Sequence, residues 1–151
     1  KFGRKAYVAR ALAEVSRALF EAELAELEAL PEPVLVVPLP LHWRRFWHRG
    51  FNQAGLLARY ALPKHKQLLQ CRALVRFRAT TALAQLPASE RPKGISGAFR
   101  ARPELVKGSS ILLIDGLMTT GSTLNEAAKA LLKAGAVRVR ACTFARTPLH
   151  Y

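Results

Sequence analysis

Hydrophobic positions divide the chain into a long N-terminal helix followed by alternating strands and helices. Apolar side chains recur about every 3.6 positions over residues 4–29, which predicts one amphipathic helix. This periodicity rests on Val8, Ala11, Leu12, Val15, Leu19, Leu24 and Leu27. Pro31 and Pro33 end the helix and force an extended backbone. The next block, VLVVPLP at 34–40, is continuously apolar, as is typical of a strand covered on both faces of a parallel sheet.

The last third of the chain has the clearest pattern. Residues 110–114 (SILLI) predict a buried strand, 115–123 a polar turn, and 123–134 a helix that ends at Gly135. Residues 137–145 alternate with period two and predict another strand. Strand, helix and strand in this order form a right-handed βαβ unit. We therefore expect an α/β fold with a mainly parallel sheet of the nucleotide-binding kind.

The middle of the chain is less regular. Residues 41–53 form a basic and aromatic loop that leads into a helix from about 52 to 61. Residues 68–75 favour a second strand. Residues 76–98 show no clear period and contain two prolines and two glycines, so a segment of this length predicts a functional loop or flap.

Charge is spread unevenly along the chain. The 151 residues carry 24 Lys and Arg against 10 Asp and Glu, a net charge of +14. Residues 1–32 hold five bases and six acids, so the other 119 residues carry a net +15. Such a field attracts nucleic acid, phosphate-rich metabolites or an anionic membrane face, although a solubility surface is an alternative.

Composition narrows the class of protein further. Half of the residues are hydrophobic, which excludes wholesale disorder. Apolar runs stay well short of the roughly 18–20 residues that a membrane span needs, so we expect no transmembrane segment. Cys71 and Cys142 are too few for a disulfide framework or a four-ligand zinc site. We expect a reduced, cytoplasmic domain.

The candidate chemistry lies after the 110–114 strand. Asp115 is the only aspartate in the chain and follows that strand, at the end where ligands bind in open α/β sheets. Small and hydroxylated residues come next: Thr119, Thr120, Gly121, Ser122 and Thr123. Their hydroxyls and the first N–H groups of the following helix would converge on an anion, which predicts a phosphate site. The alternative is an ordinary helix cap with additional threonines. The spacing matches neither a Walker loop nor a dinucleotide fingerprint.

Several motifs together resemble a known family. The segment ILLIDGLMTTGST (111–123) resembles the phosphoribosyl-pyrophosphate motif of type I phosphoribosyltransferases. VPLPLHWRRFWHRGFNQAGLLA (37–58) resembles a signature of the ComF competence family, and SERPKGISGAF (89–99) resembles that family's flap. The opening KFGRKAYVARALAE is similar to its N-terminal helix. The resemblance covers nearly the entire chain and implies a type I phosphoribosyltransferase-like fold: an N-terminal helix (1–31) packed on the core, and a phosphoribosyltransferase-like domain (32–151).

The resemblance also implies roles for single residues. Asp115 would be the catalytic residue and contact the ribose hydroxyls, while residues 119–123 would hold the 5-phosphate. The basic loop after the first strand would bind pyrophosphate through Arg44, Arg45 and Arg49, with Asn52 and Gln53 fixing that loop at the start of the next helix. Arg91, in the flap, would close over the pyrophosphate. Mg²⁺ would arrive with phosphoribosyl pyrophosphate and would not be held directly by the protein.

Three departures from the family pattern bear on activity. Gly116 stands where the motif has its second acid, which weakens the case for transfer chemistry and favours binding over turnover. The flap has Leu83 and Gly94 where the family commonly has Gln and Asn. Members usually begin with a four-cysteine zinc module, and this sequence does not contain one.

Family members are implicated in natural transformation, in which they are thought to help single-stranded DNA that has entered the cytoplasm. The resemblance therefore implies a phosphoribosyl-pyrophosphate-binding protein of DNA uptake, beside a competence helicase and a membrane DNA channel. Whether it is a magnesium-dependent transferase stays open. One alternative is a non-enzymatic module that binds single-stranded DNA, with base-stacking rings and phosphate-binding arginines drawn from Trp43, Trp47, Arg44, Arg45 and Arg49. The rings could equally pack the loop on the body. A third alternative is a regulator that senses phosphoribosyl pyrophosphate.

Overall fold

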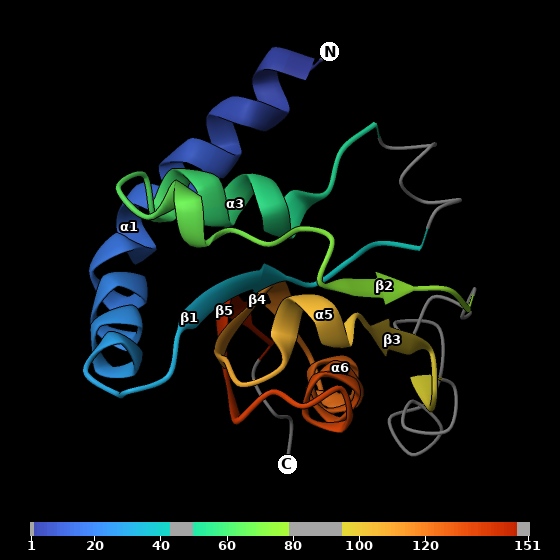
Figure 1. The fold of residues 1–151 in the computed structure, drawn as a ribbon. Coiled ribbons are helices and arrows are strands. Elements are labelled where there is room, and N and C mark those ends of the chain that lie inside the picture. Colours follow the sequence, from blue (N-terminus) through green and yellow to red (C-terminus); the bar gives the residue numbers. More distant parts are fainter. Residues whose placement is uncertain (1, 43–49, 79–94, 148–151) are drawn as a thin grey trace.

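The core of the molecule is a sheet of three parallel strands in the order β1-β4-β5 (Figure 1). The structure is a computed structural model that describes residues 2–42, 50–78 and 95–147, with side chains from residue 9 onward. The strands are β1 (Val34–Pro38), β4 (Ser110–Met118) and β5 (Arg138–Arg146). The expected α/β fold with a mainly parallel sheet is confirmed.

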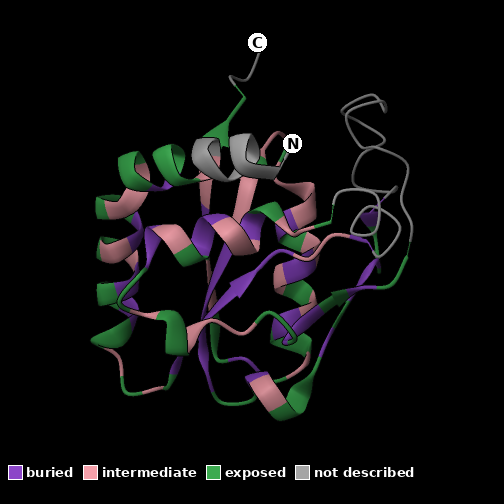
Figure 2. Cartoon of the chain, turned by 90° about the horizontal axis from the view of Figure 1, so that it is seen from above, coloured by how far each residue is buried: buried purple, intermediate pink, exposed green. Residues whose placement is uncertain are grey.

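Both faces of this sheet are covered, because alternate residues of each strand point to opposite sides. Leu112 and Ile114 of β4 pack under α1 (Phe2–Glu28) and α3 (Gln53–Ala61). Ile111 and Leu113 pack on the other side, which α6 (Ser122–Lys133) covers. These four residues of β4 are completely buried, and buried residues follow the central strands in Figure 2.

Helix α1 has close to the predicted extent, and Leu24 and Leu27 of the predicted apolar face are buried, but the rest of its buried face differs from the predicted one. The residues that it buries are Ala13, Phe20, Leu24 and Leu27, and the Phe20 ring stacks on Phe144 of β5 with centroids 4.4 Å apart. Leu12, Val15 and Leu19 are instead 47%, 88% and 54% exposed. The helix is apolar on two faces, so the sequence periodicity combined residues from both. Within the described ranges, no helix is both long enough and apolar enough to span a membrane.

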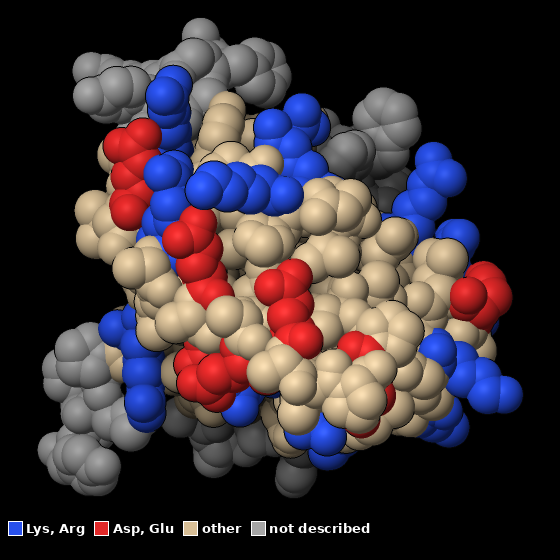
Figure 3. All heavy atoms as spheres, turned by 60° about the vertical axis from the view of Figure 1, so that its left-hand side comes forward, with Lys and Arg blue, Asp and Glu red and all other residues tan. Residues whose placement is uncertain are grey.

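Acidic residues near the end of α1 pair with the basic strand β5. Arg140 donates a hydrogen bond to Glu26 and another, of 3.0 Å, to Oε2 of Glu23. These two bonds raise the pKa of Arg140 above its usual value. Oε1 of Glu32 lies 3.6 Å from Nη2 of Arg138. Figure 3, which turns the α1 side forward, shows acidic and basic side chains next to one another there. The acidic N-terminal segment therefore lies against the basic remainder.

Strand β4 is longer than the sequence indicated. Residues 115–118 were expected to belong to a polar turn, yet they continue the strand, because β5 extends to Arg146 and supplies pairing partners. The register joins Asp115 to Thr143 and Met118 to Arg146. The turn is reduced to residues 119–121 before α6 begins at Ser122, close to the predicted start.

A second, two-stranded sheet projects from the core. Strand β2 (Leu74–Arg76) pairs antiparallel with β3 (Phe99–Ala101). The strand predicted over 68–75 is therefore mostly wrong, because its start lies in the short 3-10 helix η1 (Lys66–Leu68) and a turn follows. The expected flap lies between β2 and β3 in the sequence, and its residues 79–94 are outside the described residues. Strand β3 leads through α5 (Pro103–Val106) into β4.

Asn52 ties the two ends of the β1–α3 connection together. Its Oδ1 accepts a hydrogen bond of 3.1 Å from the Ala54 N–H and so caps α3. Its Nδ2 donates to the carbonyl oxygen of Leu39, also at 3.1 Å. The Leu39 N–H in turn donates to the carbonyl of Ile114 in β4. One side chain therefore holds the start of a helix against the end of a strand.

We expect Asn52→Ala to lower the free energy of unfolding by about 1–2 kcal/mol, because the helix loses its cap and the Leu39 carbonyl loses a donor. Asn52→Asp is the matched control, since aspartate keeps the capping oxygen and lacks the second donor, so its loss should be smaller. Urea unfolding followed by circular dichroism measures both. Equal losses for the two variants would show that capping contributes little here.

Candidate functional site

The candidate site begins where β4 ends and α6 starts. Gly121 has a φ of +75° and turns the backbone into the helix. This left-handed conformation suits glycine, which lacks a Cβ. The hydroxyl oxygens of Thr120 and Ser122 lie 2.9 Å apart and share a hydrogen bond. The first bond of the helix runs from the Asn125 N–H to the Gly121 carbonyl at 2.9 Å, so the preceding N–H groups have no acceptor within the helix.

This turn lines a hollow of about 300 Å³ on the surface of α6. Its walls are formed by Thr120, Gly121, Ser122, Asn125, Glu126 and Lys129. Hydroxyls, helix N–H groups and a lysine ammonium suit an anion, and the helix dipole adds to their effect. The one carboxylate in the wall, Glu126, accepts from Lys129 Nζ at 2.8 Å and from the Gly97 N–H at 3.1 Å. These two bonds, the Lys129 bond first, lower the pKa of Glu126.

Asp115 lies within the same strand, three residues before its end at Met118, and is half-buried. Its Oδ1 accepts a hydrogen bond of 2.7 Å from the Gly116 N–H. Burial raises the pKa of Asp115, while the Gly116 hydrogen bond and the positive charge of Arg76 partly oppose that rise. A carboxylate kept in a partly dehydrated position beside a cation is typical of a functional site.

The sequence analysis missed Asn125, Glu126 and Lys129 in the wall of the hollow, and it also missed Arg76. Arg76 lies at the end of β2, is only 8% exposed, and places its guanidinium carbon 5.6 Å from the centroid of the Phe99 ring. The sequence feature that could have identified Arg76 is the alternation in Leu-Val-Arg, because alternate residues of a strand share a face and Arg76 therefore lies on the same inward face as Leu74. Local patterns could not indicate that the charge of Arg76 would act on Asp115 of β4, because β2 and β4 belong to different sheets.

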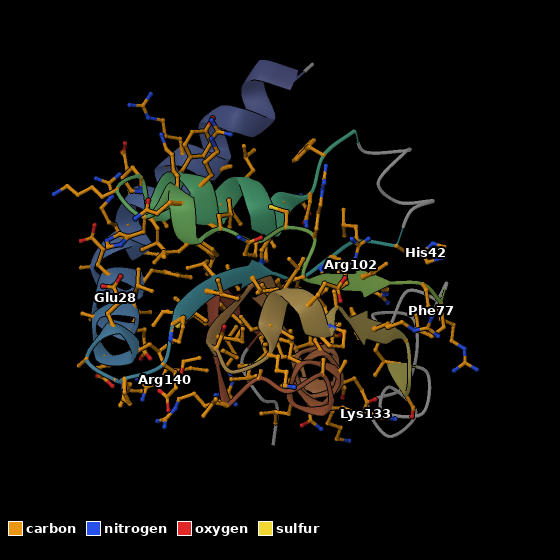
Figure 4. All side chains as sticks on the ribbon, viewed as in Figure 1. Glu28, His42, Phe77, Arg102, Lys133 and Arg140 are labelled. Atoms are coloured by element: carbon orange, nitrogen blue, oxygen red, sulfur yellow. The ribbon has the colours of Figure 1, made fainter. Side chains whose placement is uncertain are left out.

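The two chain segments that flank the expected flap are joined to each other and to α6. The Phe77 N–H donates to the Ala98 carbonyl at 3.2 Å, and Arg78 donates to the Ser96 carbonyl at 3.0 Å. The Gly97 bond to Glu126 then connects this stem to the helix that begins at Ser122. In Figure 4, Phe77 and His42 lie on the side where β2 and β3 project, whereas Glu28 and Arg140 lie beside α1.

Gly116, in place of a second acid, is not required by the backbone. Five glycines of the described residues have positive φ, and Gly116 is not among them. A Cβ at this position would lie 3.7 Å from Leu57 Cδ1, an ordinary van der Waals contact. The backbone conformation and the space around Gly116 therefore do not by themselves require glycine at this position.

The structure brings together two groups of the predicted residues. Asp115 lies in the second half of β4 and residues 119–123 follow the strand, although only Thr120, Gly121 and Ser122 of these line the hollow. Asn52 and Gln53 begin α3 after the connection that leaves the same edge of the sheet from β1. The other predicted residues lie outside the described ranges: Trp43, Arg44, Arg45, Trp47, Arg49 and Arg91. Among the described residues, no group of three or more His, Cys, Asp and Glu side chains could hold a metal ion.

Comparison with known proteins identifies the family. Residues 67–150 match the model of the phosphoribosyl transferase domain. The chain is 36% identical over 148 residues to the DNA utilization protein YhgH of Salmonella typhi, covering 97% of this chain and 64% of that protein. It is 31% identical over 150 residues to competence protein F of Haemophilus influenzae, with the same coverage of 97% and 64%. The chain thus spans about two thirds of the length of these relatives.

A solved structure supports the fold. The allosteric regulatory enzyme of purine biosynthesis aligns with 93% of this chain and 25% of its own, at a TM-score of 0.50 and 16% identity. This likeness concerns the fold alone, and it agrees with the parallel sheet β1-β4-β5 and its flanking helices. The fold, the matched domain and the named relatives agree: this chain belongs to the phosphoribosyl transferase domain family, and it is similar to members named for competence and DNA utilization.

Proposed function

We propose that this chain binds phosphoribosyl pyrophosphate, or a closely related phosphorylated ribose, at the carboxyl end of β4. The observation that carries the proposal is the position of Asp115 on the strand that leads directly into the anion-binding turn at residues 119–123. Recognition of a sugar phosphate needs two features a few residues apart. One is a carboxylate that accepts hydrogen bonds from the sugar hydroxyls, and the other is a turn that binds the phosphate. The family match supports the same class of ligand.

Each part of the site has a distinct task in this proposal. The N–H groups at the start of α6, with the hydroxyls of Thr120 and Ser122, would hold the 5-phosphate. Asp115 would accept hydrogen bonds from the ribose hydroxyls. Arg76 beside it would keep the carboxylate charged despite its burial. The basic loop after β1 would contact the pyrophosphate, and Mg²⁺ would enter as part of the ligand.

Binding, rather than phosphoribosyl transfer, is the activity we favour. Displacement at the anomeric carbon develops positive charge on the ribose, which carboxylates stabilise in the transition state. This site offers Asp115 for that purpose and has Gly116 where a second carboxylate would stand. A single, partly buried carboxylate suffices to recognise ribose hydroxyls but provides less charge to stabilise the reacting carbon.

We further propose that this ligand-binding protein takes part in the handling of DNA. The relatives are named DNA utilization and competence proteins. The proposed setting is the cytoplasmic side of DNA uptake in natural transformation, where a competence helicase and a membrane DNA channel would be partners. Ligand binding would then regulate or position the protein rather than drive a synthetic reaction.

Titration calorimetry with phosphoribosyl pyrophosphate and Mg²⁺ tests the binding site. Asp115→Asn should weaken binding about 10- to 100-fold, which corresponds to one charge-assisted hydrogen bond of about 1.5–3 kcal/mol. Gly121→Ala should also weaken binding, because a Cβ at a φ of +75° strains the turn by about 1–2 kcal/mol.

Gly55→Ala is the matched control for the glycine substitution. Gly55 lies in α3, and its Cβ would be 3.8 Å from Pro38 Cγ, so the helix should gain up to about 1 kcal/mol of stability while binding is unchanged. If neither Asp115→Asn nor Gly121→Ala alters the affinity, or if the wild-type chain gives no binding heat, the proposed site is wrong.

Asp115 should also make the fold less stable at neutral pH. Burial raises the pKa of Asp115 in the folded state. The protonated carboxyl group therefore stabilises the folded state, and this stabilisation is lost as pH rises through the folded-state pKa. Asp115→Asn keeps an oxygen acceptor for the Gly116 N–H and carries no charge. We expect it to unfold at higher urea concentration than wild type near pH 7, with the advantage disappearing near pH 3.5, below the usual aspartate pKa of about 3.9.

Glu104→Gln on α5 is the control for this pH dependence, since Glu104 is exposed. Its effect on the unfolding free energy should stay within about 0.5 kcal/mol at both pH values. Destabilisation of Asp115→Asn near pH 7 would mean that its attraction to Arg76 outweighs the dehydration of its carboxylate.

Binding of single-stranded DNA is a second candidate function, which a basic and aromatic surface on the β2–β3 sheet favours. Arg78, Arg100 and Arg102 are exposed there. The Phe77 ring is 50% exposed, with the Arg100 guanidinium carbon 5.2 Å from its centroid. Arginines that neutralise phosphates, next to a ring that can stack on a base, are typical of single-strand binding surfaces. This surface adjoins the ends of the expected flap.

Fluorescence anisotropy with labelled single-stranded DNA at several salt concentrations tests this function. Replacing Arg78, Arg100 and Arg102 together by Ala should reduce the slope of log affinity against log salt by up to about two units, at roughly 0.7 per phosphate contact. Phe77→Ala should weaken binding with little change in slope. Lys133→Ala, at the far end of α6 (Figure 4), is the control and should leave both unchanged. Absence of binding at low salt would exclude this function.

A further inference from the structure

The outward face of α1 is apolar along most of its described length. Val15 is 88% exposed, and Leu12 and Leu19 are 47% and 54% exposed, although all three are aliphatic. Four exposed alanines lie between and around them: Ala11, Ala18, Ala22 and Ala25. The exposed Glu14 of this stretch pairs with Arg10, 3.4 Å away. A contiguous apolar stripe of this kind on a surface marks an interaction site, whereas scattered single residues do not.

The spacing of this stripe is that of a helix-pairing seam. Leu12 and Leu19 are seven residues apart, and so are Val15 and Ala22. The alanines at 11, 18 and 25 repeat with the same period beside them. A seven-residue apolar repeat keeps one side of a helix facing a partner helix, and alanines on it allow a close approach. The opposite face already packs on the domain through Phe20, Leu24 and Leu27.

Charge along α1 favours one particular partner. Residues 2–10 carry Arg4, Lys5 and Arg10 and no acid, whereas residues 21–28 carry four glutamates and no base. Arg140 pairs with two of these glutamates, Glu23 and Glu26. Because four glutamates outnumber one arginine, this end of the helix keeps a net negative charge. A second α1 running in the opposite direction would bring each basic end against an acidic end, with the aliphatic stripe in the middle. A parallel arrangement would place like charges together.

We propose that α1 pairs antiparallel with α1 of a second copy of this chain, through Leu12, Val15 and Leu19, so that the protein is a dimer. The seam lies on the α1 side of the molecule, whereas the site at the end of β4 opens at the edge where β2 and β3 project (Figure 1). Both sites of the dimer are therefore free to bind ligand at the same time. The proposal does not depend on the identity of that ligand.

Sedimentation equilibrium of the wild-type chain should give twice the monomer mass of 16.7 kDa. Val15→Asp should raise the dimer dissociation constant at least about 100-fold, because the pair would bury an unpaired charge from each copy. Val15 is 88% exposed within one copy, so this variant should keep the wild-type circular dichroism spectrum. Leu132→Asp is the matched control: Leu132 is a 47% exposed leucine on α6, and its substitution should leave the dimer intact.

Spin labels distinguish the two orientations of the pair. In a Cys71→Ser background, a label on Ala29→Cys near the end of α1 should lie on the order of 40 Å from its copy in an antiparallel pair, since the helix rises about 1.5 Å per residue. In a parallel pair the two labels would be roughly 10 Å apart. A wild-type chain that is monomeric at high micromolar concentration, a dimer that survives Val15→Asp, or a short label distance would each overturn the proposal.

Discussion

The structure depends on the complete burial of one strand, β4, in the middle of a parallel sheet. Ile111, Leu112, Leu113 and Ile114 are all fully inaccessible to solvent. Burial of each aliphatic side chain contributes about 1.5–3 kcal/mol. Strand β4 pairs with β1 and β5 on its two edges and is covered by helices on both faces, so its backbone is held firmly in place. The residues that follow it along the chain therefore begin from a fixed position.

The polar residues of the candidate site follow the buried part of β4. The buried strand continues directly into Asp115, then into the turn at 119–121 and the first residues of α6. The turn depends on Gly121 for its left-handed backbone, and Asp115 accepts a hydrogen bond from its own neighbour, Gly116. A carboxylate and a group of anion-binding N–H groups are thereby held a few residues apart without a long loop.

The site is completed by parts that come from distant segments. The positive charge of Arg76, on β2, lowers the pKa of Asp115 against the effect of burial, and the stem of the expected flap is tied to α6 through Gly97 and Glu126. Asn52 holds the end of β1 against the start of α3. Each of these contacts joins segments that local propensity treats independently. They connect the start of α3, the segments that flank the expected flap and the start of α6.

The sequence by itself determined the order of the main elements, the parallel sheet and the turn before α6, because these follow from local periodicity and from Gly121. The tertiary structure alone decided which face of α1 is buried, since Leu12, Val15 and Leu19 are as apolar as the residues that pack. It also decided that β4 runs on to Met118, because β5 supplies the pairing partners, and that the charge of Arg76 acts on Asp115. The sequence pattern shows how apolar a position is, whereas its burial depends on which other segment of the chain packs against it.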